Sequence, residues 1–113
     1  MVGFSHDHEV VIEYCAPCNY LDRASGLAVE ILSCWGPIIK EVVLLPTAWG
    51  VFEVTLDNEL IFSKWALGRH ALPGELRSLI SKRIGPELAE WVDHGPEKTN
   101  DAGFSLYAKM PAV

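Results

Sequence analysis

The feature that most constrains this chain is Cys15-Ala16-Pro17-Cys18, which joins two stretches of different periodicity. Residues 9–14 before it form a short, nearly continuous apolar run rich in β-branched side chains, which predicts a strand covered on both faces. After it, apolar residues recur at three- and four-residue steps up to Trp35, which predicts an amphipathic helix opening at or just after Cys18. Two cysteines at this spacing can close one small disulfide ring.

Size and charge bound the class of protein. With 113 residues, half of them apolar, the chain is long enough for one hydrophobic core and too short for two. Its net charge of -6 and the lack of a basic cluster larger than Lys82-Arg83 argue against nucleic acid or an anionic membrane surface as the main partner. No apolar run approaches the roughly 18 residues of a membrane span, and residues 1–8 lack the pattern of a signal peptide. We therefore expect a cytoplasmic protein.

The three cysteines indicate a functional role and not a framework of structural disulfides, because a reducing cytosol disfavours such disulfides. Cys15 and Cys18 are then a redox, sensing or metal-binding pair. Cys34 lies sixteen residues beyond Cys18, about 24 Å along an intact helix, whereas a disulfide needs Cα atoms within about 7 Å. We expect Cys34 to be a small, partly buried apolar residue.

The remaining elements alternate between strand and helix patterns. We predict strands at 40–45, 50–56 and 59–64 and a helix over 73–84. Gly36-Pro37 should end the first helix through a left-handed glycine cap, and Asp57-Asn58 should close a two-residue hairpin. The expected fold is α/β (α+β), in the order β-α-β-β-β-α, with a mixed four-stranded sheet whose first pair is parallel.

Three parts of the chain are expected: a flexible N-terminus over 1–8, one domain over 9–84 and a C-terminal extension over 85–113. The extension contains a pattern for a short helix at 87–93 followed by an irregular segment. It could pack Trp91 and Phe104 against the sheet or against a second copy of the chain, giving a homodimer.

With this order of elements, the chain resembles the selenoprotein W-related (Rdx; SelT/SelW/SelH) family of small thioredoxin-like proteins. The resemblance covers roughly residues 9–84 and is carried by Ile-Glu-Tyr-Cys-Ala-Pro-Cys-Asn-Tyr at 12–20, Gly-Val-Phe-Glu-Val at 50–54 and Glu-Leu-Ile-Phe-Ser-Lys at 59–64. It implies a thioredoxin-like fold and a thiol redox role with glutathione or a protein thiol as partner. Selenoprotein members carry selenocysteine where this chain has Cys18, so it is similar to the cysteine-containing form.

The order of attack within the pair is open from sequence. A cysteine at a helix N-terminus is stabilised as thiolate by the helix dipole, and Cys15, entering the turn while exposed, is slightly favoured as the nucleophile. Cys18, inside the first helical turn, would then resolve the mixed disulfide. The position of selenocysteine in the family argues for the reverse order. Pro17 restricts the turn between the two sulfurs.

Pro17 and three further residues are candidates for binding a substrate. Pro46 lies near the place where thioredoxin-like folds carry a cis-proline opposite the dithiol, although a trans-proline in a loop fits as well. Trp49 and Trp65 could form an apolar rim beside the dithiol, or each could belong to the core.

Two alternatives to redox chemistry remain. The same surface could hold a partner protein without turnover. A zinc site could combine the two cysteines with His6 and His8, although a solvated tail explains these histidines better. His70 and His94 are expected in loops or at the surface. Glutathione is the one co-substrate expected, and no bound cofactor or metal is.

Overall fold

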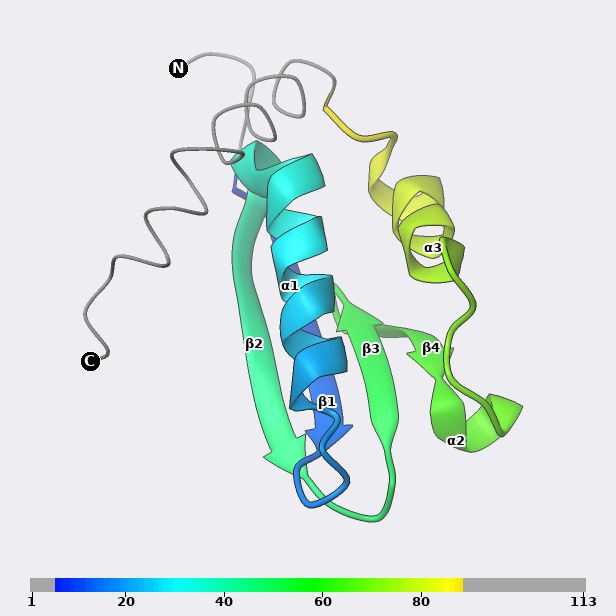
Figure 1. The fold of residues 1–113 in the computed structure, drawn as a ribbon. Coiled ribbons are helices and arrows are strands. Elements are labelled where there is room, and N and C mark those ends of the chain that lie inside the picture. The colour runs from blue at the N-terminus through cyan, green and yellow to red at the C-terminus, as the bar shows by residue number, and fades with distance from the viewer. Residues whose placement is uncertain (1–5, 89–113) are drawn as a thin grey trace, which may run out of the picture.

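Four strands form one mixed sheet in the spatial order β2-β1-β3-β4, with the helices packed beside it (Figure 1). The computed structural model describes residues 6–88. Its elements are β1 (His8–Cys15), α1 (Leu21–Trp35), the 3-10 helix η1 (Gly36–Ile38), β2 (Ile39–Thr47), β3 (Phe52–Leu56), β4 (Glu59–Ser63), α2 (Lys64–Leu67) and α3 (Glu75–Ile84).

The predicted strand pairing is confirmed. The strand β1 runs parallel to β2 and antiparallel to β3, and β3 pairs with β4 in a hairpin. Asp57 and Asn58 close that hairpin with φ angles of 51° and 69°, and Asn and Asp adopt such left-handed conformations more readily than most residues. The parallel pair is possible because α1 supplies the crossover between its strands.

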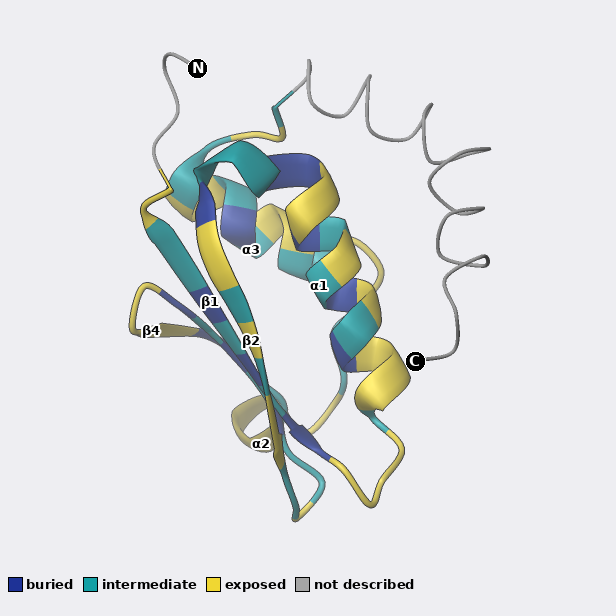
Figure 2. Ribbon diagram, turned by 90° about the vertical axis from the view of Figure 1, so that its left-hand side faces the viewer, coloured by how far each residue is buried: buried dark blue, intermediate teal, exposed yellow. Residues whose placement is uncertain are grey.

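The helices α1 and α3 lie on the same side of the sheet (Figure 2). Along β1, Val10, Ile12 and Tyr14 are buried on the helix side, while Val11 and Glu13 alternate with them and are only half-buried. The prediction of a strand covered on both faces is therefore wrong for the part of the chain that the structure describes. One crossover helix can cover only one face of the sheet. The apolar run therefore contains the usual alternation of a half-covered strand, with every second side chain buried.

The core joins α1 to the sheet and to the end of α3. Trp35, fully buried, is among its largest members and donates a hydrogen bond of 2.8 Å from Nε1 to the carbonyl oxygen of Gly85. This bond satisfies the indole N–H, which burial would otherwise leave unpaired at a cost of about 1–3 kcal/mol. The last turn of α1 is thereby tied to the residue that ends α3.

Both helices begin later than predicted. The helix α1 begins at Leu21, and the chain leaves it through η1, with Gly36 in the right-handed helical region at φ -44° instead of a left-handed cap. The fixed φ of Pro37 suits the tighter 3-10 turn. The helix α3 begins at Glu75, after Gly74 in the left-handed region at φ 80°, so its proline precedes the first turn.

Two strand ends and one short helix also differ from the prediction. The strand β2 continues through Pro46, which is tolerated because β2 is an edge strand and a missing N–H can face outward there. Residues 50 and 51 precede β3. The short helix α2 was not predicted; its cap is the Ser63 side chain, which accepts a hydrogen bond from the Ala66 amide at 2.9 Å.

The predicted loose start does not extend to His8. That residue opens β1, and its Nδ1 lies 2.6 Å from a carboxylate oxygen of Asp57. Residues 1–5, and the predictions made for Trp91, His94 and Phe104, lie outside the described residues, as does almost all of the helix predicted at 87–93. None of the helices described is long and apolar enough to cross a membrane.

Candidate functional site

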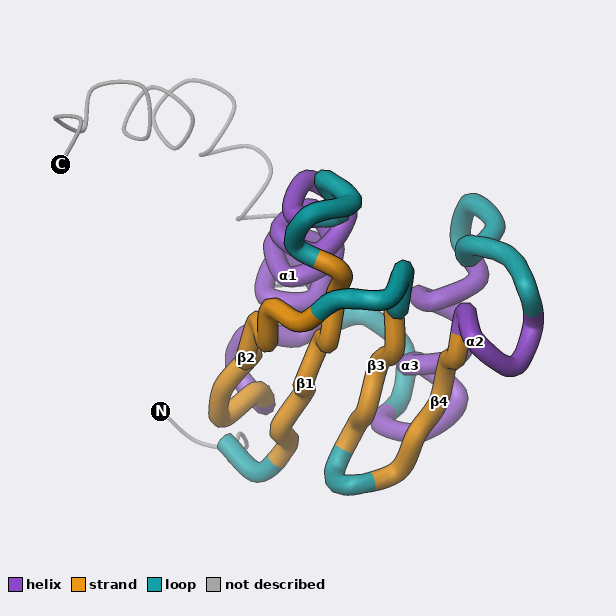
Figure 3. Tube along the Cα trace, turned by 90° about the horizontal axis from the view of Figure 1, so that it is seen from below, coloured by secondary structure: helices purple, strands orange, loops and turns teal. Residues whose placement is uncertain are grey.

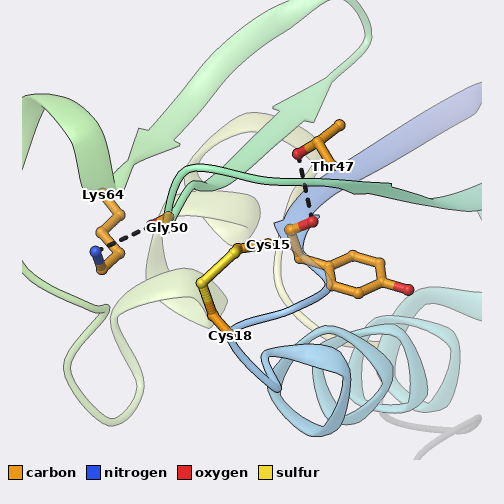
Figure 4. The surroundings of a disulfide bond; sticks show 6 residues. Cys15, Cys18, Thr47, Gly50 and Lys64 are labelled. Atoms are coloured by element: carbon orange, nitrogen blue, oxygen red, sulfur yellow. Dashed lines mark hydrogen bonds between the residues drawn. A yellow bond between two sulfur atoms is a disulfide. The ribbon is translucent and has the colours of Figure 1, made fainter.

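Cys15 and Cys18 are joined by a disulfide at the C-terminal end of β1, with their Cα atoms 5.3 Å apart (Figure 4). The intervening residues form a turn that leads into α1. Asn19 adopts a left-handed conformation with φ 66° and donates its amide to the carbonyl oxygen of Ala16 at 3.1 Å, which reverses the chain after the second cysteine.

The loop between β2 and β3 holds the base of this turn. The Cys15 amide donates to the carbonyl oxygen of Val51, and the Ala16 amide to that of Thr47, each at 2.9 Å. The Thr47 hydroxyl donates to the carbonyl oxygen of Tyr14 at 3.3 Å. The loop and the disulfide are therefore parts of one hydrogen-bonded unit.

The two sulfur-bearing residues differ in their access to solvent. Cys15 is fully buried, whereas Cys18 is exposed in the turn. The expectation that Cys15 stays exposed is wrong, because it is the last residue of a central strand and the loop between β2 and β3 lies against it. Cys18 is not inside the first helical turn either, since α1 begins only at Leu21. The argument that favoured Cys15 as the nucleophile loses both of its premises.

Lys64, the last residue of the 59–64 stretch that carries the family resemblance, lies across the loop from the disulfide (Figure 4). Nothing in the sequence predicted its contact with this loop. Its Nζ donates to the carbonyl oxygen of Gly50 at 3.0 Å and stands 5.7 Å from the centre of the Tyr20 ring. Gly50 has φ 71°, a conformation that glycine adopts at no steric cost, so its carbonyl can turn toward the ammonium group. Only the fold brings these two residues together.

His70 joins the same neighbourhood from the loop before α3. Its ring meets that of Tyr20 edge-on at a centroid distance of 4.7 Å, and it lines a groove with Arg23 and Phe52. Partial burial and the positive charges of Arg23 and Lys64 lower the pKa of His70, which favours the neutral ring at pH 7. The prediction of a loop position is confirmed, and its packing against Tyr20 is a finding of the structure.

All four residues predicted to bind a substrate, namely Pro17, Pro46, Trp49 and Trp65, are exposed. Pro17 is exposed in the turn between the cysteines. Pro46 is exposed in β2, pairs in register with Tyr14 and follows a trans peptide bond. Trp49 is 88% exposed and Trp65 78% exposed, so neither belongs to the core.

The third cysteine stands apart from the pair. Cys34 is buried and not disulfide-bonded, in agreement with the helix-length argument. The Arg77 guanidinium lies 2.9 Å from its sulfur, and the same guanidinium pairs with Glu30 at 3.2 Å.

The zinc alternative that used His8 is excluded by the length of β1. His8 opens that strand and Cys15 ends it, and strand residues rise about 3.3 Å each, so the two are about 23 Å apart. Zinc ligands must lie within about 2.3 Å of one ion. Within residues 6–88, no cluster of three or more His, Cys, Asp or Glu side chains could hold a metal ion.

A Cys-x-x-Cys disulfide at the end of a central strand, followed by a helix on one side of a mixed sheet, defines a thioredoxin-like protein with a redox-related site. The chain belongs to the Rdx family, whose model matches residues 9–82. No curated protein sequence matches the chain.

Two crystal structures support this assignment. A selenoprotein W-related protein from Vibrio cholerae has a TM-score of 0.65 and 26% identity, over 69% of this chain and 98% of its own. A protein from Bordetella parapertussis has a TM-score of 0.64 and 28% identity, over 68% of this chain and 98% of its own. The chain is thus similar to both over their almost complete length.

Proposed function

We propose that this protein carries out thiol–disulfide exchange, cycling Cys15 and Cys18 between dithiol and disulfide with glutathione or a protein thiol. The observation that carries the proposal is the contrast between an exposed Cys18 and a fully buried Cys15 within one disulfide. Exchange requires that an incoming sulfur reach one sulfur in line with the bond that breaks, while the other sulfur leaves. This disulfide offers one accessible sulfur and one protected leaving group.

The exposure favours attack at Cys18, the reverse of the order preferred from sequence. A thiolate of the partner attacks Sγ of Cys18, a mixed disulfide forms, and Cys15 leaves as a thiolate that takes up a proton. A second thiol of the same partner, or a second glutathione, then attacks the mixed disulfide and releases Cys18. The partner leaves oxidised, and the Cys15–Cys18 pair has gained two electrons and two protons.

A titration against glutathione redox buffers tests the cycle in a Cys34→Ala background, which removes the third thiol. We expect one two-electron transition between dithiol and disulfide, measured by thiol alkylation and mass spectrometry. If no intramolecular disulfide forms at any ratio of oxidised to reduced glutathione, the proposal is wrong.

Single-cysteine variants test the order of attack. In the same Cys34→Ala background, Cys15→Ser keeps the exposed Cys18 and should form a mixed disulfide with oxidised glutathione at least about tenfold faster than Cys18→Ser, whose remaining thiol is buried. Circular dichroism of both variants controls for folding. Equal rates, or a faster Cys18→Ser variant, would contradict the assignment of Cys18.

Because the cycle depends on a pool of reduced thiols, we propose the cytoplasm as the location of this protein.

A binding function without turnover is the second candidate, and the exposed Trp49 and Trp65 support it. A Cys15→Ser, Cys18→Ser double variant that captures every partner with unchanged affinity would favour this candidate over exchange. If the double variant captures no partner, while Cys15→Ser traps partners as mixed disulfides through Cys18, exchange is favoured.

A further inference from the structure

We propose that Trp49 and Trp65 form a recognition rim beside Cys18 that selects protein substrates whose reactive cysteine is flanked by large apolar side chains. This inference rests on the proposed exchange function and specifies its substrate class. The rim is defined as these two tryptophans throughout.

The exposure of the rim has no explanation in folding. Trp49 and Trp65 are 88% and 78% exposed, whereas no other large apolar side chain among residues 6–88 exceeds 57%. Single exposed leucines are common at protein surfaces, but tryptophan carries the largest apolar surface of any residue and is enriched where proteins bind each other.

The backbone of Trp49 adds a second, independent sign of function. Its φ of 68° lies in the left-handed region, which crowds the Cβ of any residue except glycine. An asparagine or glycine would suit this position better, and the exposed indole gains almost nothing from packing in return. A strained conformation kept without a packing benefit is typical of functional sites.

The rim is held in a defined place relative to the disulfide. Lys64, the neighbour of Trp65 in sequence, donates through Nζ to the carbonyl oxygen of Gly50, the neighbour of Trp49. The next residue, Val51, accepts the Cys15 amide at 2.9 Å. The loop that carries Trp49 and the helix α2 that carries Trp65 are thereby linked to each other and to the dithiol through main-chain and Lys64 contacts.

The arrangement of the elements agrees with this linkage. The turn after β1, the loop between β2 and β3, and α2 all lie at the same end of the sheet, as the view from that end shows (Figure 3). On the side of α2, the Trp65 amide donates to Glu53 of β3 at 3.2 Å, which anchors the backbone that carries the second indole to the sheet. A chain segment that reaches Cys18 therefore arrives at the end of the sheet that carries both tryptophans.

The chemistry of the rim points to a protein cysteine with apolar neighbours. Burying an apolar side chain against an indole removes apolar surface from water, which favours binding. Glutathione is small and carries two carboxylates and an ammonium group, so it offers the indoles little apolar surface to bury. A peptide segment with leucine or phenylalanine beside its cysteine can.

The test measures attack at Cys18 directly. A Cys15→Ser, Cys34→Ala protein is charged at Cys18 with thionitrobenzoate, and a peptide thiolate that attacks Sγ of Cys18 releases the coloured thiol as the new disulfide forms. Two peptides carry the same cysteine, one flanked by Phe and Leu and the other by Ser and Asn. We expect the apolar peptide to react about tenfold faster.

The variants assign that preference to the rim. Trp49→Asn and Trp65→Ser should each bring the ratio of the two peptide rates close to one. Leu60→Ser removes a side chain of β4 that is 56% exposed at the opposite end of the sheet, and should leave the ratio unchanged. Circular dichroism and thermal melts establish that each variant is folded.

Several results would overturn the proposal that the rim selects substrates. Equal rates for the two peptides would remove the preference, and an unchanged ratio in both tryptophan variants would place it elsewhere. A wild-type dimer in light scattering that becomes monomeric in Trp49→Asn would assign the rim to a second copy of this chain. Failure of glutathione and of both peptides to react at all would instead refute the proposed exchange function.

Discussion

Replacing Trp49 by asparagine should stabilise the protein, although it removes a large aromatic side chain. A left-handed conformation costs an ordinary residue about 1–2 kcal/mol, and asparagine relieves much of this. Trp49 is 88% exposed, so roughly 30 Å² of its side chain is buried, worth about 0.7 kcal/mol. The relief exceeds the loss, and we expect a gain of about 0.5 kcal/mol.

Urea denaturation of the oxidised protein, followed by far-ultraviolet circular dichroism, measures this gain as a higher midpoint at unchanged slope. Trp49→Ala is the matched control, because alanine also loses the indole but keeps the steric cost of a positive φ. It should lose about 0.7 kcal/mol, so the two variants should differ in sign. Equal losses would refute the argument from φ, and a loss above about 1.5 kcal/mol in both would show that Trp49 is packed.

Three other predictions concern stability. Trp35→Phe should lose about 2–3 kcal/mol in urea denaturation, because it opens space in the core and leaves the Gly85 carbonyl without the indole donor; a loss below about 0.5 kcal/mol would contradict this. Hydrogen bonds from Arg69 and from the backbone amide of Leu72 lower the pKa of Glu75 to about 2 from 4.5. The ionised carboxylate therefore stabilises the folded protein above pH 4.5, and this stabilisation should be lost as the pH falls toward 2. Glu75→Gln should flatten that part of the plot of stability against pH. Ser63→Ala should lose about 1 kcal/mol by removing the cap of α2, as measured by the thermal midpoint, with an unchanged midpoint arguing that α2 needs no cap.

Local patterns in the sequence were enough for the strand order and the hairpin. A helix between two strands permits a parallel pair, and Asp57-Asn58 permits only an antiparallel one, so the mixed sheet followed from residues close together in the chain. The apolar residues that recur at three- and four-residue steps up to Trp35 likewise located α1. These signals are local because turn chemistry and helical periodicity act over a few residues.

Predictions that depended on what packs against an element were less successful. The run in β1 suggested cover on both faces, but an apolar residue such as Val11 can lie half-buried on a face that no described helix covers. Pro46 was expected to end a strand, yet an edge position tolerates it inside β2. The local sequence pattern does not show that β2 lies at the edge of the sheet, nor that no described helix covers the second face of β1.

Spacing along the chain was enough to identify Cys15 and Cys18 as the pair at this site, since only these two cysteines are close enough for their sulfurs to meet across one turn. It did not determine which sulfur is accessible. Burial of Cys15 follows from its place at the end of a central strand, and exposure of Cys18 from a turn that α1 does not yet include. The hydrogen bond from Lys64 to Gly50, which links the two elements that carry Trp49 and Trp65, joins residues fourteen apart in the sequence, and such a contact exists only once the sheet has formed.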